Sequence, residues 1–461
     1  MSKYADDFRR AGREAVDWVA DYLENARQYP VLPKIKPGEL IDALPASAPE
    51  KGESLEAILK DFRELIVPAT TLWNHPRFMA YFPSASSPPA ILAEMLAAAL
   101  NTNAIHWKTS PASTELEQVA LGWLRQWMGL PEEFFGIIFD TASISSMHAI
   151  AAAREMADPE ARENGMRPGM VLYASDQAHS SIEKDSIALG IGRRNLRKIE
   201  SDSEFRMRTD LLEAAIERDL AAGKRPFCIV ATVGTTSTTS FDPLPRIADI
   251  AERYGLWLHV DAAYAGAAMI VPELRPLFDG IERAHSLVTN AHKWMFMPMD
   301  VSMFFTRRPD ILRRAFSLVP EYLRTAEHPR AVNLMEYAVP LGRRFRSLKL
   351  WFALRYFGRE GMIEVLRSHV RWAAEFASWV DADPRFERVA PAPLSAVCFR
   401  FKGTDEENKA IIDCVNATGK FFLSHTVLNG KFVARLAIGN LYTTRQDVEE
   451  AWELIRSTAP R

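Results

Sequence analysis

Residues 256–264 read LWLHVDAAY, a short apolar run that ends in an aspartate, two alanines and a tyrosine. Similar runs occur along the middle of the chain, separated by longer segments of helical periodicity, at residues 171–173, 229–232, 287–289 and 303–305. Short buried strands that alternate with helices are typical of a mainly parallel sheet covered on both faces. We therefore predict an α/β fold, in which functional groups gather at the carboxyl ends of the strands.

One of the intervening helices has clear sequence boundaries, at residues 243–254. Asp242 is a candidate N-cap, Pro243 occupies the first helical position, and Gly255 follows the last turn. Aspartate, proline and glycine are each favoured at these positions of a helix.

The composition excludes several classes of protein. The chain has 461 residues, of which 48% are hydrophobic and 25% charged, so it can build two or three units around a sizeable core. Its 56 basic and 59 acidic residues leave a net charge of −3, which argues against a nucleic-acid partner. The cysteines, Cys228, Cys398 and Cys414, lie far apart, so neither a disulfide framework nor a metal site is predicted.

The chain start and the apolar stretches favour a cytoplasmic protein with no membrane segment. Residues 4–10 alternate charged and apolar side chains, unlike a signal peptide. The longest apolar stretch, residues 90–100, is interrupted by Glu94 and is too short to cross a bilayer.

The periodicity divides the chain into an N-terminal segment (1–83), a large domain (84–349) and a small α+β domain (350–461). The first segment contains an amphipathic helix at residues 4–24 and then a proline-rich connector. Because this helical arm has no core of its own, it must pack on the main body or on a second copy of the chain. The small domain is predicted from a long helix and two strands, at residues 362–380, 396–401 and 432–438.

Polar residues follow three predicted strands, at 234–236, 261–264 and 290–293. In a parallel sheet all three groups would lie at one edge. Lys293 and Asp261 at such an edge suit pyridoxal phosphate, which needs an amine for a Schiff base and a carboxylate beside its ring nitrogen.

Each of these residues has a simpler interpretation when it is taken alone. A lysine is usually a solvated surface cation, and Asp261 could cap a helix. His179 could stack on a cofactor ring or be a hydrogen-bonded structural residue. The Ser/Thr cluster at 141–146 could bind phosphate at a helix N-terminus or cap that helix. Lys293 and Asp261 together favour a functional site, and no dinucleotide-binding or Walker-type loop competes with it.

Longer motifs along nearly the whole chain give a family resemblance. They are FRRAG (8–12), HPRF (75–78), AYFP (80–83), SPASTELE (110–117), YASDQAHSS (173–181), WLHVDAAYAG (257–266), HKW (292–294) and LGRRFRSLK (341–349). With them the chain resembles the pyridoxal-phosphate-dependent group II decarboxylases, and among these the enzymes that act on aromatic L-amino acids. The resemblance implies the fold-type I transferase fold and a homodimer whose active sites lie at the interface.

The resemblance also implies roles for individual residues. Lys293 would form the Schiff base with pyridoxal phosphate, Asp261 would pair with the pyridine nitrogen, and His179 would stack on the ring. Tyr322 would protonate the carbanion after carbon dioxide leaves. The remaining cofactor residues would be Ala142 and Ser143 at the phosphate, with Thr236, Ala263, Asn290 and His292 around the ring.

The implied substrate is tryptophan, 5-hydroxytryptophan, DOPA, tyrosine or phenylalanine, converted to the arylalkylamine and carbon dioxide. The residues that correspond to the family's substrate pocket are Trp73, Tyr81, Phe82, Pro83, Asn103, Ile105 and Gly342. In relatives, glycine at the position of Gly342 accompanies DOPA, 5-hydroxytryptophan or tryptophan, whereas serine accompanies histidine or, in plants, tyrosine.

The sequence departs from the family at a few positions. Residues 136–144 read GIIFDTASI in place of a glycine-rich run followed by Gly-Ser-Ala-Ser-Glu, and Ala291 replaces a usual proline. Asn103 and Ile105 stand where relatives carry an apolar residue and an aromatic residue contributed by the partner subunit. These departures bear on the cofactor affinity and on the choice of substrate.

Two rival functions follow from the same residues. An aldehyde synthase on this scaffold would oxidise the carbanion, but its plant members carry phenylalanine at the position of Tyr322. A catalytically silent binding protein would explain the altered phosphate segment, but Lys293, Asp261, His179 and Tyr322 argue against it.

Overall fold

The computed structural model describes residues 3–318 and 330–460. Within these residues the larger of two sheets has seven strands, in the order β2-β8-β7-β6-β5-β3-β4. Their bounds are β2 Phe135–Phe139, β3 Met170–Ser175, β4 Leu196–Ile199, β5 Arg225–Thr232, β6 Trp257–Asp261, β7 Ser286–Asn290 and β8 Ser302–Thr306. In the sheet, neighbours among β4, β3, β5, β6 and β7, in that order, pair in parallel. Strand β8 lies between β7 and β2 and runs antiparallel to both. The predicted α/β fold with a mainly parallel sheet is confirmed.

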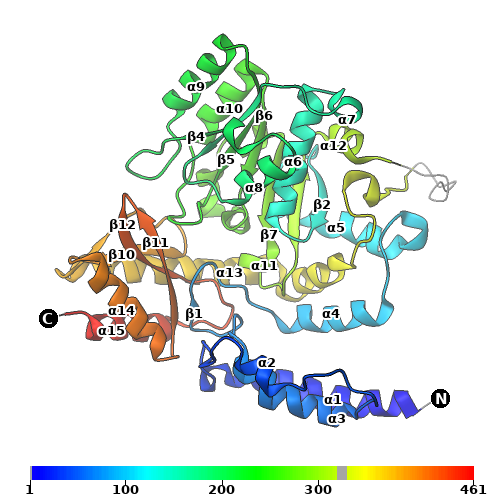
Figure 1. Ribbon diagram of the computed structural model, residues 1–461, viewed down its shortest axis with the longest axis vertical. Coiled ribbons are helices and arrows are strands. Elements are labelled where there is room, and N and C mark those ends of the chain that lie inside the picture. The colour runs from blue at the N-terminus through cyan, green and yellow to red at the C-terminus, as the bar shows by residue number, and fades with distance from the viewer. Residues whose placement is uncertain (1–2, 319–329, 461) are drawn as a thin grey trace.

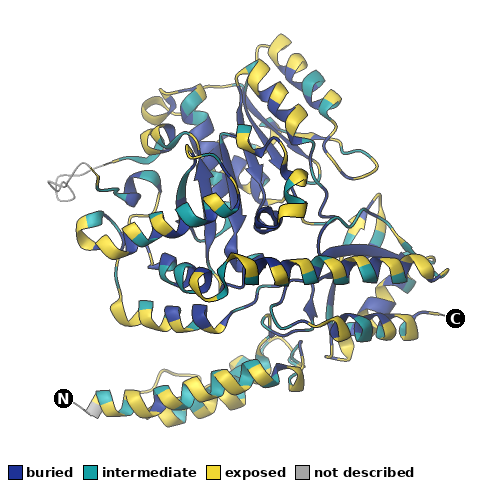
Figure 2. Cartoon of the chain, turned by 180° about the vertical axis from the view of Figure 1, so that it is seen from behind, coloured by how far each residue is buried: buried dark blue, intermediate teal, exposed yellow. Residues whose placement is uncertain are grey.

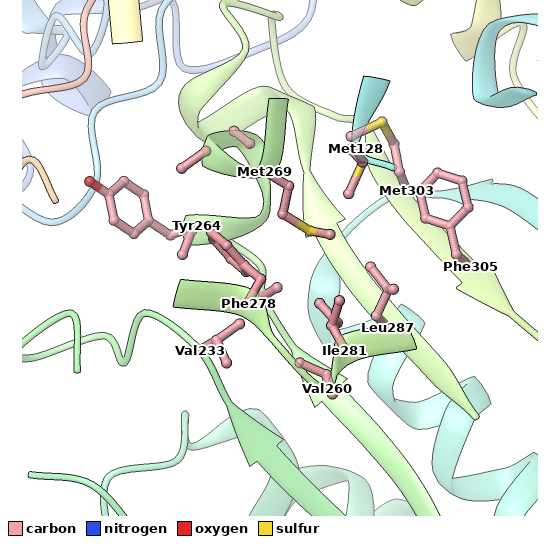
Figure 3. Packing of buried hydrophobic residues seen from close by; sticks show 14 of the residues in the cluster. Met128, Val233, Val260, Tyr264, Met269, Phe278, Ile281, Leu287, Met303 and Phe305 are labelled. Atoms are coloured by element: carbon pink, nitrogen blue, oxygen red, sulfur yellow. The ribbon is translucent and has the colours of Figure 1, made fainter. Parts of the chain in front are cut away.

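Helices cover both faces of this sheet, so its central strands are buried throughout (Figure 1). On one face Trp257 packs in the cluster that includes the helices α6 (Ala142–Ala157), α8 (Ser181–Ala188) and α12 (Pro309–Phe316). On the other face Leu258 and Val260 pack in the cluster that includes α5 (Pro111–Trp127), α9 (Thr209–Ala221), α10 (Leu244–Tyr254) and α13 (Arg346–Ala382). Figure 3 shows part of the second cluster, to which β6, β7 and β8 contribute Val260, Leu287 and Phe305. The alternation of side chains along each strand therefore builds two apolar layers.

The helices around the sheet are α5 Pro111–Trp127, α6 Ala142–Ala157, α7 Ala161–Asn164, α8 Ser181–Ala188, α9 Thr209–Ala221, α10 Leu244–Tyr254, α11 Ala291–Trp294 and α12 Pro309–Phe316. The predicted helix at residues 243–254 is confirmed within one residue, as α10. Gly255 ends α10 in the left-handed conformation, with a φ of 65°. This is the predicted role of glycine after a last turn.

The predicted N-cap at Asp242 is wrong. Helix α10 begins one residue later than expected, and Pro243 occupies the cap position without a side-chain hydrogen bond. The buried Asp242 carboxylate instead accepts the backbone N–H groups of Met207 and Thr232, at 2.7 and 2.8 Å. Buried N–H groups need partners, and the Asp242 carboxylate supplies one to each of these two.

The C-terminal part of the chain builds a second, smaller sheet in the order β1-β11-β12-β10-β9. Its strands are β1 Phe78–Met79, β9 Phe386–Arg388, β10 Ala396–Phe401, β11 Phe422–Leu428 and β12 Lys431–Ala437, with helices α13 Arg346–Ala382, α14 Asp405–Ala417 and α15 Arg445–Thr458. The predicted strand at 396–401 is confirmed, and the predicted helix at 362–380 is part of the longer α13. The boundary expected between residues 349 and 350 lies inside α13, and β1 joins the small sheet from the N-terminal segment. The division into domains stays a prediction.

The N-terminal helices lie apart from both sheets (Figure 1). They are α1 Lys3–Asn25, α2 Glu39–Ala43 and α3 Leu55–Asp61, and α4 Pro88–Leu100 follows nearer the body. Trp18 of α1 contacts Phe62, just after α3, with ring centroids 5.0 Å apart. Most of α1 is exposed (Figure 2), including Tyr4 and Phe8. None of the described helices is both long and apolar enough to cross a membrane.

Candidate active site

A cavity of about 180 Å³ lies where β5, β6 and β7 end at their carboxyl edge. Its lining consists of Phe82, Thr141, Ala142, Ser143, His179, Thr232, Gly234, Thr236, Asp261, Ala263, Tyr264, Asn290, His292, Lys293 and Met299. Every residue predicted to bind the cofactor is in this lining. The polar groups that follow separate strands therefore meet at one edge, as expected for parallel strands.

Asp261 is the last residue of β6, where it lies beside Thr232 of β5 and Val288 of β7. Its side chain is 5% exposed, and its Oδ1 accepts the backbone N–H of Ala263 at 3.0 Å. The helix-cap interpretation is wrong, because the next helix, the 3₁₀ helix Ala265–Ile270, has Tyr264 at its cap position. A buried carboxylate held in this way provides a fixed negative charge on the cavity wall.

Lys293 lies in the short helix α11 directly after β7, between buried neighbours. Its Nζ is 5.5 Å from the centroid of the Phe82 ring. Burial lowers the pKa of Lys293; Asp261 opposes this effect and Arg435 adds to it. The lowered pKa increases the fraction of free amine, so Lys293 is a better nucleophile than a solvated surface lysine.

His179 lies in the loop between β3 and α8. Its Nδ1 is 2.9 Å from the Oγ of Ser181 and accepts the Ser181 backbone N–H at 3.2 Å. Burial lowers the pKa of His179; Asp261 opposes this effect and Lys293 adds to it. A neutral imidazole can stack its flat face on an aromatic ligand without adding charge.

Ser143 lies in the first turn of α6, a helix of 16 residues whose N-terminus faces the cavity. Thr141 holds the cap position but makes no side-chain cap bond; the Asp140 carboxylate accepts the Thr141 backbone N–H at 2.6 Å. Ser145 and Ser146 bond inward, to Ser302 and His259. The N-terminal amides and the Ser143 hydroxyl are thus placed to bind an anion such as phosphate.

The lining has the groups that pyridoxal phosphate requires: an amine, a carboxylate, a flat ring and an anion site. Two buried polar atoms, the Oγ1 of Thr232 and the Oδ1 of Asn290, have no hydrogen-bond partner within the described parts of the chain. A bound ligand could satisfy them. The residues present therefore fit this cofactor. In the same parts of the chain, no cluster of His, Cys, Asp or Glu is arranged to hold a metal ion.

The predicted substrate residues fall into two separate groups. Phe82 lines the cavity and stacks on Tyr264, with centroids 3.9 Å apart. Trp73 and Tyr81 stack on each other, with ring centroids 5.7 Å apart, and are about half exposed. Tyr81 and the buried Pro83 flank Phe82 along the chain.

The second group consists of Asn103, Ile105 and Gly342, none of which lines the cavity. Asn103 accepts the Arg343 backbone N–H at 2.9 Å, and Ile105 accepts that of Met335 at 3.3 Å. A Cβ added at Gly342 would lie 3.8 Å from the Asn103 amide. Tyr322, the predicted proton donor, lies outside the described residues.

The sequence analysis missed several residues at the site, including Tyr264, Thr232 and Met299, which line the cavity. Tyr264 is the last residue of the polar group at 261–264, so its position past a strand end was a usable signal. Arg435, which acts on Lys293, comes from the small sheet and has no such signal.

Comparisons with known proteins agree with this site. The Pyridoxal-dependent decarboxylase conserved domain matches residues 37–402. The chain is 43% identical to aromatic-L-amino-acid decarboxylase of Sus scrofa, with 99% of this chain and 96% of that protein covered. It is 41% identical, with the same coverage, to phenylacetaldehyde synthase of Arabidopsis thaliana. The crystal structure of Oryza sativa TDC with PLP and tryptamine has a TM-score of 0.96 at 36% identity, covering 99% of this chain and 98% of that one.

Proposed function

This chain belongs to the family of pyridoxal-dependent decarboxylases, and we propose that it decarboxylates an aromatic L-amino acid to the arylalkylamine and carbon dioxide. One observation carries this proposal. Lys293, Asp261, His179 and Ser143 line a single cavity, in a chain that is similar over its full length to an aromatic-L-amino-acid decarboxylase.

Lys293 would hold pyridoxal phosphate covalently, Asp261 would pair with its ring nitrogen, and the N-terminus of α6 with Ala142 and Ser143 would bind its phosphate. When bound, the cofactor supplies an electron sink for the bond that breaks. Asp261 would favour a proton on the ring nitrogen by opposite-charge pairing. His179 would pack against the ring, and Thr236, Ala263, Asn290 and His292 would complete the surrounding wall.

The side chains around the cavity decide which bond breaks, because only a bond perpendicular to the ring can lose its electrons to it. Trp73, Tyr81, Phe82 and Pro83 provide flat apolar surface for an aromatic side chain, which orients the α-carboxylate. The Tyr322 hydroxyl would deliver the proton that replaces carbon dioxide. Gly342 leaves space beside Asn103, which favours tryptophan, 5-hydroxytryptophan or DOPA over smaller substrates.

The active enzyme would be a homodimer with its active sites at the interface. Asn103, Ile105 and Gly342 lie away from the cavity of their own chain, so they would complete the site of the partner. Exposed apolar side chains supply surface for such an interface, on α4 (Leu92, Met95, Leu96 and Leu100) and on α1 (Tyr4, Phe8 and Val16). Large exposed apolar surface is characteristic of protein interfaces.

For the domain organisation we keep the division predicted from the sequence. Residues 1–83 would be a dimerisation segment, residues 84–349 the cofactor domain and residues 350–461 the small domain. The free cysteines Cys228, Cys398 and Cys414 favour a reducing cytoplasm as the location.

An aldehyde synthase is the second candidate, favoured by the similarity to the Arabidopsis thaliana enzyme. The purified protein, loaded with pyridoxal phosphate, would be incubated with tryptophan, 5-hydroxytryptophan, DOPA, tyrosine, phenylalanine and histidine. We expect amine and carbon dioxide from the aromatic substrates. Aldehyde and peroxide in place of amine would identify a synthase. A protein that develops no visible absorbance band with the cofactor would be a silent binding protein.

A further inference from the structure

Arg435, on β12 of the small sheet, is a buried cation without a carboxylate partner. It is 3% exposed, and within residues 3–318 and 330–460 no acidic group forms an ion pair with it. Burying an unpaired charge is unfavourable unless hydrogen bonds and other contacts compensate for it. The contacts that stabilise Arg435 therefore indicate its role.

The guanidinium bonds two chain segments that form walls of the cavity. Its Nε donates to the carbonyl of Ser237 at 2.8 Å, and its Nη1 donates to the carbonyl of Tyr81 at 3.0 Å. Ser237 follows Thr236, and Tyr81 precedes Phe82; both Thr236 and Phe82 line the cavity. One rigid fork of donors thus fixes the distance between the two walls.

The Tyr81 carbonyl is held in a direction that the backbone does not favour. Tyr81 has a φ of 50°, in the left-handed region that residues with a side chain rarely adopt. Its backbone N–H also bonds to the Ser424 hydroxyl, at 3.0 Å, and the Nη1 of Arg435 lies 3.3 Å from the same hydroxyl. Arg435 and Ser424 of the small sheet together keep the turn before Phe82 in this conformation.

Two cations lie near the Phe82 ring. The Cζ of Arg435 is 5.0 Å from the Phe82 centroid, and the Nζ of Lys293 is 5.5 Å from it. Phe82 and Lys293 line the cavity, and Arg435 lies next to Phe82 outside the lining. At this range in a buried site, one positive charge disfavours a second.

We propose that Arg435 is a positioning residue of the cofactor cavity: it holds the Phe82 and Thr236 walls together and disfavours a positive charge on the Lys293 amine. This inference rests on the proposed function of Lys293. Through Arg435 the small sheet would influence the charge of the Lys293 amine, although no residue of that sheet lines the cavity. The lowered pKa of Lys293, to which Arg435 contributes, is consistent with it.

Two variants separate the charge from the hydrogen bonds. Arg435→Met removes both, and Arg435→Lys keeps the charge but loses the fork. The matched control is Arg400→Met, because Arg400 lies on β10 of the same sheet, is 5% exposed, and bonds to Gly403 and Asp405 away from the cavity. The rate at which cofactor-free protein develops the visible absorbance of bound pyridoxal phosphate would be measured as a function of pH.

We expect Arg435→Met to move the midpoint of this pH profile upward and to slow cofactor attachment at neutral pH by about 3-fold or more, since one pH unit corresponds to about 10-fold. Arg435→Lys should keep the midpoint but weaken cofactor retention and raise the KM for substrate. Arg400→Met should change neither property. If Arg435→Met does not fold, Arg435→Gln, which keeps amide donors without the charge, provides the same comparison.

An unchanged midpoint in both neutral variants would overturn the inference. So would a selective loss of affinity for the amino acid with normal affinity for its amine product, because that pattern would mean direct binding of the substrate carboxylate. A wild-type protein that binds no pyridoxal phosphate would contradict the proposed function instead, so the two failures can be distinguished.

Discussion

The cofactor residues and the substrate residues of this protein are organised differently. The cofactor residues all line one cavity within a single chain, whereas Asn103, Ile105 and Gly342 form a separate cluster. The first set lies at the ends of parallel strands and at the start of a helix, which the sheet brings together. The second set lies on connecting segments, where a partner chain would have to bring it to the cavity. We call the first set the cofactor half of the site and the second set its substrate half. The cofactor half lies within one chain, and in the proposed homodimer the substrate half would come from the partner.

The largest expected effect tests the cofactor half. Replacement of Lys293 by alanine should abolish the visible band of bound cofactor and lower kcat at least ~1000-fold, because no other amine lines the cavity. Absorbance and amine production would both be measured. Lys224→Ala, an exposed lysine between α9 and β5, is the control. Retained cofactor absorbance in the Lys293 variant would contradict the assignment.

Removal of the arm tests whether the substrate half requires a partner. A chain without residues 1–50 should lose the dimer and with it at least ~10-fold in activity, because folded-state stability and assembly are linked in obligate dimers. Sedimentation and amine production would be compared with the full-length chain at equal concentration. A stable and active dimer without the arm would show that these residues are dispensable for assembly.

Hybrid dimers test more directly whether Ile105 serves the site of its own chain or that of the partner. Ile105→Glu should lower kcat/KM about 10-fold, because it places a charge beside an aromatic substrate. If Ile105 serves the partner's cavity, mixing these chains with Lys293→Ala chains creates one site with both defects and one intact site. Activity of the mixture should then exceed the sum of the two separate variants. Strictly additive activity would place Ile105 in its own chain's site.

Gly342→Ser should have a smaller effect, confined to substrate choice. An added Cβ meets the Asn103 amide only at 3.8 Å, an ordinary contact, so the thermal midpoint should not change. Partial filling of a pocket by a small group alters discrimination by about 10-fold at most in this setting. The ratio of kcat/KM for tryptophan to that for tyrosine would be measured, and we expect it to fall.

The smallest effect on activity is expected where the arm joins the small domain. Asp447 pairs with Arg27 at 2.7 Å and with Arg77 at 2.8 Å. Burial alone would raise its pKa, but the hydrogen bonds from Arg27, Arg77 and Thr444 hold the pKa of Asp447 at about 2, below its ordinary 3.8. A depressed pKa stabilises the fold above about pH 4, and this stabilisation is lost as the pH falls toward 2.

Asp447→Asn should therefore lower the free energy of unfolding by about 1–2 kcal/mol at neutral pH, with a smaller loss below pH 4 and an unchanged kcat. Urea unfolding at several pH values would measure it. Asp413→Asn, in an exposed pair with Lys409, is the control and should show little change. A loss of stability that does not vary with pH would mean that packing, and not charge, is what Asp447 provides.

Much of the fold and of the cofactor site could be predicted from the sequence because both rest on local patterns. The apolar runs around 171–173, 256–260 and 287–289 each form a buried strand. Polar residues at or after the ends of these strands line the cavity, because parallel strands share one carboxyl edge. Asp242 was misassigned because its position fits a helix cap, while its actual partners, Met207 and Thr232, are brought near it only by folding.

The amino-acid sequence by itself determined the α/β class and the residues that can hold the cofactor, because periodicity and strand ends are read within about ten residues. Only the tertiary structure decided that Arg435 lies beside Phe82 and that Asn103 and Gly342 lie away from the cavity. These contacts join segments more than 200 residues apart. Their formation depends on how whole layers pack, which no local pattern specifies.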